Sequence, residues 1–243
     1  MRRDRMFLDK RHKLFLVLAA IFVVCFVVGD IIGGKLVEVR LLGFSWGTTV
    51  GMIPFPVTFL LTDLLNEFYG KRAARFVTLV GFGAAVLAFV FITIAGTVDP
   101  HPMSKAWGGV SKVAFDEVFM GSRRILVASL CAYLVSQFID IGIFQLLKRT
   151  TENRMLWLRA TGSTAASQLI DTAIVSTLGW GETMPVAELI KMIFVNYGLK
   201  VVIAIGLTPL IYLGHALVQR GLGIEPILIG DAPDDRVNSA SQG

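Results

Sequence analysis

The chain has 243 residues, of which 54% are hydrophobic and only 17% are charged, and its formal net charge is +5. This composition is typical of an integral membrane protein, and the basic residues fall in short clusters between apolar runs, which excludes a nucleic-acid-binding face. Cys25 and Cys131 lie in apolar runs without His or Cys neighbours at ligand spacing, so we expect no disulfide framework, no metal site and no cofactor.

Six apolar segments follow one another, each long enough to cross a bilayer. The first is interrupted only by Asp30, and the third carries no charge. We predict an all-α membrane protein with a six-helix bundle at 14–218, a basic tail at 1–13 and a polar tail at 219–243. The predicted spans are 14–34, 41–68, 76–98, 125–147, 160–180 and 192–218.

The second segment contains glycines at four-residue intervals and two prolines. Gly43, Gly47 and Gly51 would allow close helix packing, whereas Pro54 and Pro56 in mid-run can break a helix. Two interpretations stay open, a packing helix and a broken helix that lines a site.

Three polar residues end the second segment, just before the basic turn at 71–75. Asp63, Asn66 and Glu67 are spaced i, i+3 and i+4, so they share one face of a helix. Asp63 lies deep enough to reach a substrate. We predict that Asn66, Glu67 and the nearby Thr62 form an inner rim or gate.

An even number of spans places both termini on one side of the membrane. Of the 23 Lys and Arg residues, fifteen fall on the side of the termini, four of them between Lys148 and Arg159, and seven on the other side. By the positive-inside rule, both termini are therefore expected in the cytoplasm. The remaining one, Lys200, lies within the sixth span.

The fourth and fifth spans share a motif, Ser-Gln-x-x-Asp, at 136–140 and again at 167–171. Consecutive spans run in opposite directions, so the two copies predict a small inverted repeat, an arrangement with which transporters build a site at mid-membrane. In each copy the three polar groups share a helix face. With groups at similar depth, the candidate substrate ligands are Asp140, Asp171, Gln137, Gln168, Lys200, Asn196 and Asp63.

Intramembrane ionisable residues usually serve a function, although a structural ion pair among Asp140, Asp171 and Lys200 is the alternative. Carboxylates accept hydrogen bonds, Lys donates them and the amides do both, which suits a small planar heterocycle. Aromatic residues that could stack on it are Phe55, Phe59, Phe138, Tyr197 and Trp180.

These residues resemble the queuosine precursor transporters of the vitamin uptake transporter group. The resemblance rests on P-x-T-F-x-x-T-D-x-x-N-E-x-Y-G-K-R-x-A-R at 56–75, on the paired motifs, and on Asn196 and Lys200 before Thr208-Pro209. It covers residues 14–218. It implies a multi-pass importer in the bacterial inner membrane that takes up 7-cyano-7-deazaguanine or its aminomethyl relative for tRNA modification, by secondary or facilitated transport. Asp140 or Asp171 would accept from the donor edge, with Gln168, Asn196 or Lys200 at the acceptor edge.

Two alternatives remain at this stage. The substrate-binding subunit of an energy-coupling-factor vitamin importer would also have six spans, but the Ala-x-x-x-Ala contact expected in its first helix is reduced here to Ala19-Ala20. An intramembrane diaspartyl protease could use Asp140 and Asp171. The Gly-x-Gly-Asp motif expected there is missing, since Ile170 precedes Asp171, so we expect no enzyme. The sequence leaves open whether the chain forms a homo-oligomer.

Overall fold

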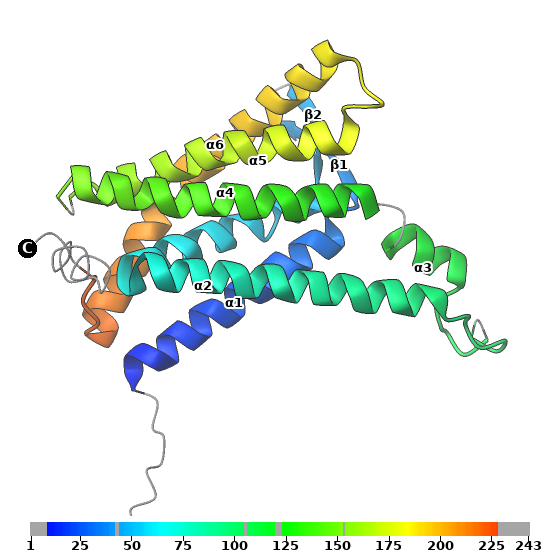
Figure 1. Cartoon of the computed structure of the whole chain (residues 1–243), viewed down its shortest axis with the longest axis horizontal. Coiled ribbons are helices and arrows are strands. Elements are labelled where there is room, and N and C mark those ends of the chain that lie inside the picture. The colour runs from blue at the N-terminus through cyan, green and yellow to red at the C-terminus, as the bar shows by residue number, and fades with distance from the viewer. Residues whose placement is uncertain (1–8, 42–43, 105, 120–122, 153, 228–243) are drawn as a thin grey trace, which may run out of the picture.

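The computed structural model describes residues 9–227, apart from 42–43, 105, 120–122 and 153. Residues 1–8 of the predicted basic tail, residues 228–243 of the predicted polar tail and Lys105, one of the seven charges predicted on the outer side, lie outside these residues. Within the described part, helices form a bundle with one small β-hairpin at one end (Figure 1). In chain order the elements are α1 Lys10–Ile32, β1 Leu36–Leu41, β2 Phe44–Thr49, η1 Val50–Met52, α2 Phe55–Thr97, α3 Lys112–Phe119, α4 Arg123–Thr150, α5 Leu156–Trp180, α6 Val186–Ala216 and η2 Leu217–Gly221.

The predicted start of the second span is wrong. Residues that we expected to be helical from Leu41 form the antiparallel hairpin β1–β2, in which Leu36 pairs with Thr49 and Leu41 with Phe44. The physical reason lies in the alternation of β-branched or apolar residues with polar ones along 37–40, which has the two-residue period of a strand. Gly47 therefore lies in a strand and not in a helix-packing stripe.

The two prolines begin a helix instead of breaking one. Pro54 caps α2 and Pro56 lies in its first turn, where the missing N–H groups would have no partner in any case. The loop before α2 packs closely on α1, since a Cβ added at Gly51 would lie 2.8 Å from the carbonyl oxygen of Gly29. Glycine at position 51 thus lets η1 touch α1.

Helix α2 turns back on itself at Gly70. This residue has φ 79° and ψ 176°, a conformation open to glycine, and it divides α2 into arms at 55–69 and 71–97 (Figure 1). Carbonyl groups freed at the turn find new donors: Arg11 Nη2 donates to Phe68 O over 2.7 Å, and Ile227 N donates to Glu67 O over 3.1 Å. The second arm matches the predicted third span.

The other predicted spans, 14–34, 125–147, 160–180 and 192–218, coincide with α1, α4, α5 and α6 to within six residues at each end. Helices α4 and α5 lie side by side along most of their length, and α6 packs against α5 (Figure 1). Between α2 and α4 lies the short helix α3, whose Lys112 pairs with Asp99 over 2.6 Å. The main apolar core joins α1, both arms of α2 and α4 around Phe22, Leu65 and Val77.

Polarity is distributed as in a membrane protein. Large apolar side chains such as Leu16, Phe91 and Val202 face outward, whereas Asp63, Asn66 and other polar groups are buried. Four helices of the described residues are long and apolar enough to cross a membrane, within 10–32, 50–97, 126–150 and 186–221. Helix α5 is not among these four, and its sequence contains more Ser, Thr and Gln than theirs. The chain is therefore a multi-pass membrane protein.

Candidate functional site

A cavity of about 310 Å³ lies among α1, α2, α4, α5 and α6, at the end of the bundle that holds the β-hairpin. Ligand pockets range from about 300 to 1,000 Å³, so it could hold a small molecule. The N-terminus of α2 faces it through Pro54 and Phe55. Five of the predicted substrate ligands line it, namely Gln137, Gln168, Asp171, Asn196 and Lys200.

Lys200 is the centre of the polar wall. Its Nζ donates to Asp171 Oδ2 over 2.7 Å and to Gln168 Oε1 over 2.9 Å, and it lies 5.2 Å from the ring centroid of Phe55. Helix α6 thus contributes the cation, α5 the carboxylate and the amide, and α2 the aromatic face. Gln137 Oε1, from α4, is buried without a hydrogen-bond partner among the described residues. This wall offers acceptors and donors to one ligand.

The two Ser-Gln-x-x-Asp motifs contact each other across α4 and α5. Ser136 Oγ donates to Asp171 Oδ1 over 3.2 Å, and Ser167 Oγ donates to Asp140 Oδ1 over 3.2 Å. Each motif therefore supplies the hydroxyl that binds the carboxylate of the other. The reciprocal contacts tie the positions of the two carboxylates together.

Sequence reasoning missed Asp30 as a site residue. Asp30 lines the cavity from α1, its Oδ1 accepts a hydrogen bond from Ser129 Oγ over 3.0 Å, and its Oδ2 has no partner among the described residues. Tyr133 stacks on Phe26 beside it, with ring centroids 3.8 Å apart. The available signal was the single acid in the first apolar run, because a charge at membrane depth is costly.

The predicted aromatic residues divide into two groups. Phe55, Phe59 and Trp180 line the cavity, and Phe55 and Phe59 lie 4.4 Å apart between ring centroids. Phe138 instead contacts Arg75, whose guanidinium lies 5.8 Å from its ring centroid, and Tyr197 is not among the lining residues. Stacking on a bound ring is therefore available from α2 and α5.

Asp140 and Asp63 lie away from this cavity. Both are buried, at 1% and 2% relative exposure, and neither is among the lining residues. Asp140 rests on α5 against Ser163, Thr164 and Ser167, and its Oδ2 has no partner among the described residues. Asp63 borders a separate space of about 10 Å³, and its Oδ1 is also unpartnered there. The predicted ligand set thus separates into a cavity group and a buried pair.

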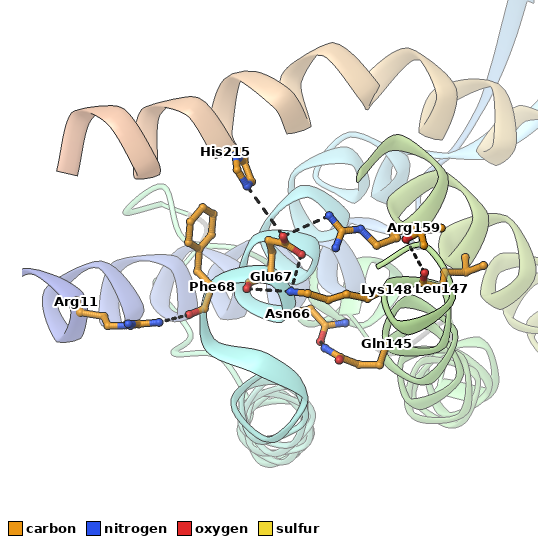
Figure 2. Close-up of polar contacts among 10 residues, drawn as sticks. Arg11, Asn66, Glu67, Phe68, Gln145, Leu147, Lys148, Arg159 and His215 are labelled. Atoms are coloured by element: carbon orange, nitrogen blue, oxygen red, sulfur yellow. Dashed lines mark hydrogen bonds and ion pairs between the residues drawn. The ribbon is translucent and has the colours of Figure 1, made fainter. Parts of the chain in front are cut away.

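A buried ion cluster lies at the C-terminal end of the first α2 arm, the end away from the β-hairpin (Figure 2). Glu67 accepts from Lys148 Nζ over 2.9 Å and from Arg159 Nη2 over 3.3 Å, and His215 Nε2 lies 4.0 Å away. Lys148 and Arg159, which we had counted as inner loop charges, have side-chain exposures of 3% and 2%. Their burial reflects the need of a buried carboxylate for counter-charges.

Of the other two residues of the predicted rim, Asn66 is next to Glu67 in the chain, and Thr62 lies more than one helical turn away toward Thr58. Asn66 Oδ1 accepts from Gln145 Nε2 over 2.7 Å, which joins α2 to α4 (Figure 2). Thr62 is buried and donates to the carbonyl of Thr58 within its own helix. Phe55 and Glu67 are twelve positions apart on α2, a rise of about 18 Å, whereas Thr62 is only three positions from Phe59, which lines the cavity.

Comparisons with known proteins give a consistent result. Residues 49–214 match the family model described as putative vitamin uptake transporter. A "Probable queuosine precursor transporter" of Bacillus subtilis is 29% identical over 178 residues, which cover 73% of this chain and 76% of the relative. The "Queuosine precursor transporter" of Escherichia coli is 31% identical over 135 residues, 55% of each chain. A "Probable queuosine precursor transporter" of Haemophilus influenzae is 28% identical over 166 residues, 67% of this chain and 66% of the relative. No solved structure gives a significant match.

Proposed function

This chain belongs to the putative vitamin uptake transporter family, and we propose that it imports a queuosine precursor across the bacterial inner membrane. The precursor we propose is 7-cyano-7-deazaguanine, 7-aminomethyl-7-deazaguanine or both. The chain is a transporter and not an enzyme, so the protease alternative is set aside.

The contact of Lys200 with Asp171 and Gln168 in the cavity wall is the observation that carries this proposal. A guanine-like ring has N–H groups on one edge and a carbonyl oxygen beside them. Asp171 would accept from the N–H groups, and Lys200 would donate to the carbonyl oxygen. The side chain of Gln137 and that of Asn196 complete the polar wall, while Phe55 provides a face for the ring.

The site lies in a fold for which we propose six crossings. The two arms of α2 and the polar helix α5 count separately in this scheme, and both termini lie in the cytoplasm. The cavity then faces the outer side, and Asn66, Glu67 and Thr62 form the inner rim. The buried Glu67 cluster supports a gate at this rim, because it holds α2, α4 and α5 together below the cavity.

Uptake in a bacterial strain unable to make deazaguanines tests the function. Cells that express this chain receive either the cyano or the aminomethyl precursor, and queuosine is then measured in their tRNA. We expect wild-type protein to restore queuosine and Asp171→Ala to abolish it while the variant still inserts in the membrane. If wild-type protein restores nothing with either precursor, the proposed substrate is wrong.

The same strain separates this function from that of an energy-coupling-factor subunit. In a host that also lacks every coupling ATPase, a self-sufficient transporter still restores queuosine. Loss of rescue only in that host would mean that the chain binds the precursor for another protein to move.

A further inference from the structure

Five charged side chains are buried among the described residues, each with at most 4% relative exposure, and their charges do not balance. They are Asp63, Glu67, Asp140, Lys148 and Arg159, three acids and two bases. If all five were ionised, one negative charge would remain uncompensated in a space without bulk water. An uncompensated buried charge is so costly that the group usually binds a proton instead. The set of five side chains is therefore electrically neutral when one of its three acids carries a proton.

The contacts indicate where that proton resides. Glu67 already has Lys148 and Arg159 as partners at 2.9 and 3.3 Å. Asp63 and Asp140 have no ion-pair partner within 4.0 Å among the described residues, and each has one oxygen without a hydrogen-bond partner. Ser167 donates to Asp140 Oδ1 over 3.2 Å, and the hydroxyls of Ser163 and Thr164 lie against the same carboxylate.

The surroundings of the pair contain few other charges. Asp63 on α2 is faced by Asp140 from α4 and Arg159 from α5, with Glu67 one turn further along α2. Around Asp140, helix α5 presents the hydroxyls of Ser163, Thr164 and Ser167. The residues of α6 that border the small space beside Asp63 are apolar, namely Ala204, Leu207 and Ile211, while Lys200 and His215 of α6 contact Asp171 and Glu67.

Resting on the proposed function, we propose that Asp63 and Asp140 form the proton-binding site of a proton-coupled importer, separate from the substrate site at Asp171 and Lys200. The proton comes from the outer solution, binds a carboxylate oxygen of the pair and leaves to the cytoplasm once the inner rim opens. The space beside Asp63 is about 10 Å³, at or below the room that one water molecule needs, so it suits a proton better than a metal cation.

The link between the two sites is the reciprocal contact of the repeated motifs. Ser167 donates to Asp140, and Ser136 donates to Asp171, so each site is bound to the helix that carries the other. Protonation of Asp140 weakens the carboxylate as the acceptor of the hydrogen bond that Ser167 donates. Substrate that displaces Lys200 from Asp171 changes the environment of Ser136. Both events act on the α4–α5 pair, which supports coupling between them.

The test uses purified full-length protein in liposomes with a labelled deazaguanine. Exchange without any gradient measures binding and translocation, and uptake driven by acid outside at clamped voltage measures coupling. For one proton per substrate, a gradient of one pH unit drives about tenfold accumulation. We expect this accumulation in wild-type protein, together with acidification of the interior read from a trapped pH dye.

Substitutions divide the two sites. We expect Asp63→Asn and Asp140→Asn to keep exchange and lose the response to the pH gradient, with accumulation falling to about onefold, since Asn holds no exchangeable charge. Asp171→Asn should lose exchange itself. The control Asp99→Asn, at an exposed ion pair, should change neither.

Three results would overturn the proton site. They are wild-type exchange without pH-driven accumulation or interior acidification, accumulation driven by a sodium gradient instead, and normal pH-driven accumulation in both Asn variants. The wild-type dye measurement does not depend on how the variants fold. A wild-type protein that exchanges no deazaguanine at all would refute the proposed function, and the proton site with it.

Discussion

Two ion pairs of this bundle differ in what surrounds them. Asp171 and Lys200 are 2.7 Å apart with side-chain exposures of 16% and 13%, beside an open cavity. Glu67 and Lys148 are 2.9 Å apart with exposures of 5% and 3%, and Arg159 adds a second cation. The first pair can exchange its partners for a ligand or for water. The second cannot do so without opening the protein, which fits the proposed role of the first pair in binding substrate and that of the second in a gate.

Of the substitutions considered, Glu67→Ala is expected to have the largest effect on stability. Removing the carboxylate leaves Lys148 and Arg159 as uncompensated buried cations, which should lower the free energy of unfolding by about 3–5 kcal/mol. Denaturant unfolding in detergent, followed by helix content, measures the loss. Asp99→Ala is the matched control, since it breaks a solvent-exposed pair whose loss should change stability far less. Equal stabilities of the two variants would contradict the sealing role of Glu67.

Lys200→Ala probes the open pair from the other side. We expect precursor uptake to fall by about 10- to 100-fold, because a hydrogen bond to a charged group contributes about 1.5–3 kcal/mol. Unfolding should change much less than in Glu67→Ala, since water can reach Asp171 through the cavity. Lys191→Ala, exposed on the same helix, is the control for uptake. Normal uptake by the Lys200 variant would place the substrate elsewhere.

The difference between these pairs also marks the limit of sequence reasoning. Spacing on a helix face predicted that Asp171, Gln168 and Lys200 lie at similar depth, and they contact each other. Asp140 and Asp171 occupy the same position in the two copies of the motif, but only Asp171 lines the cavity. Spacing along the helix could not reveal this difference, because it depends on how α4 is rotated against α5. Lys148 and Arg159 looked like loop charges for the same reason.

Backbone errors had a similar origin. Apolar content alone extended the second span back to Leu41, where a two-residue alternation forms the hairpin instead. Pro54 and Pro56 suggested a broken helix, since the sequence does not say whether a proline lies inside a helix or at its start. The turn at Gly70, by contrast, lies immediately before the basic residues at 71–75, where the sequence predicts that the chain leaves the membrane.

Gly70→Ala is expected to have the smallest effect of these substitutions, and it tests whether the Glu67 end of the bundle can be weakened without changing the substrate site. At φ 79° and ψ 176° an alanine is strained, which should cost about 1–3 kcal/mol of unfolding free energy and loosen the turn that follows Glu67. The nearest atom to an added Cβ is 3.7 Å away, so backbone strain and not crowding would be the cause.

Gly83→Ala is the control for this strain, because it lies in the second arm of α2 with open space around it and should instead gain about 0.5–1 kcal/mol. Since Glu67 lies eight positions, or about 12 Å, along α2 from Phe59 in the cavity wall, Gly70→Ala should leave the affinity for precursor unchanged while it destabilises the Glu67 end of the bundle. Equilibrium binding and denaturant unfolding on the same preparation check both parts. A loss of affinity as large as the loss of uptake expected for Lys200→Ala would mean that the two ends of the bundle are not independent. The Glu67 cluster would then affect the geometry of the substrate site itself.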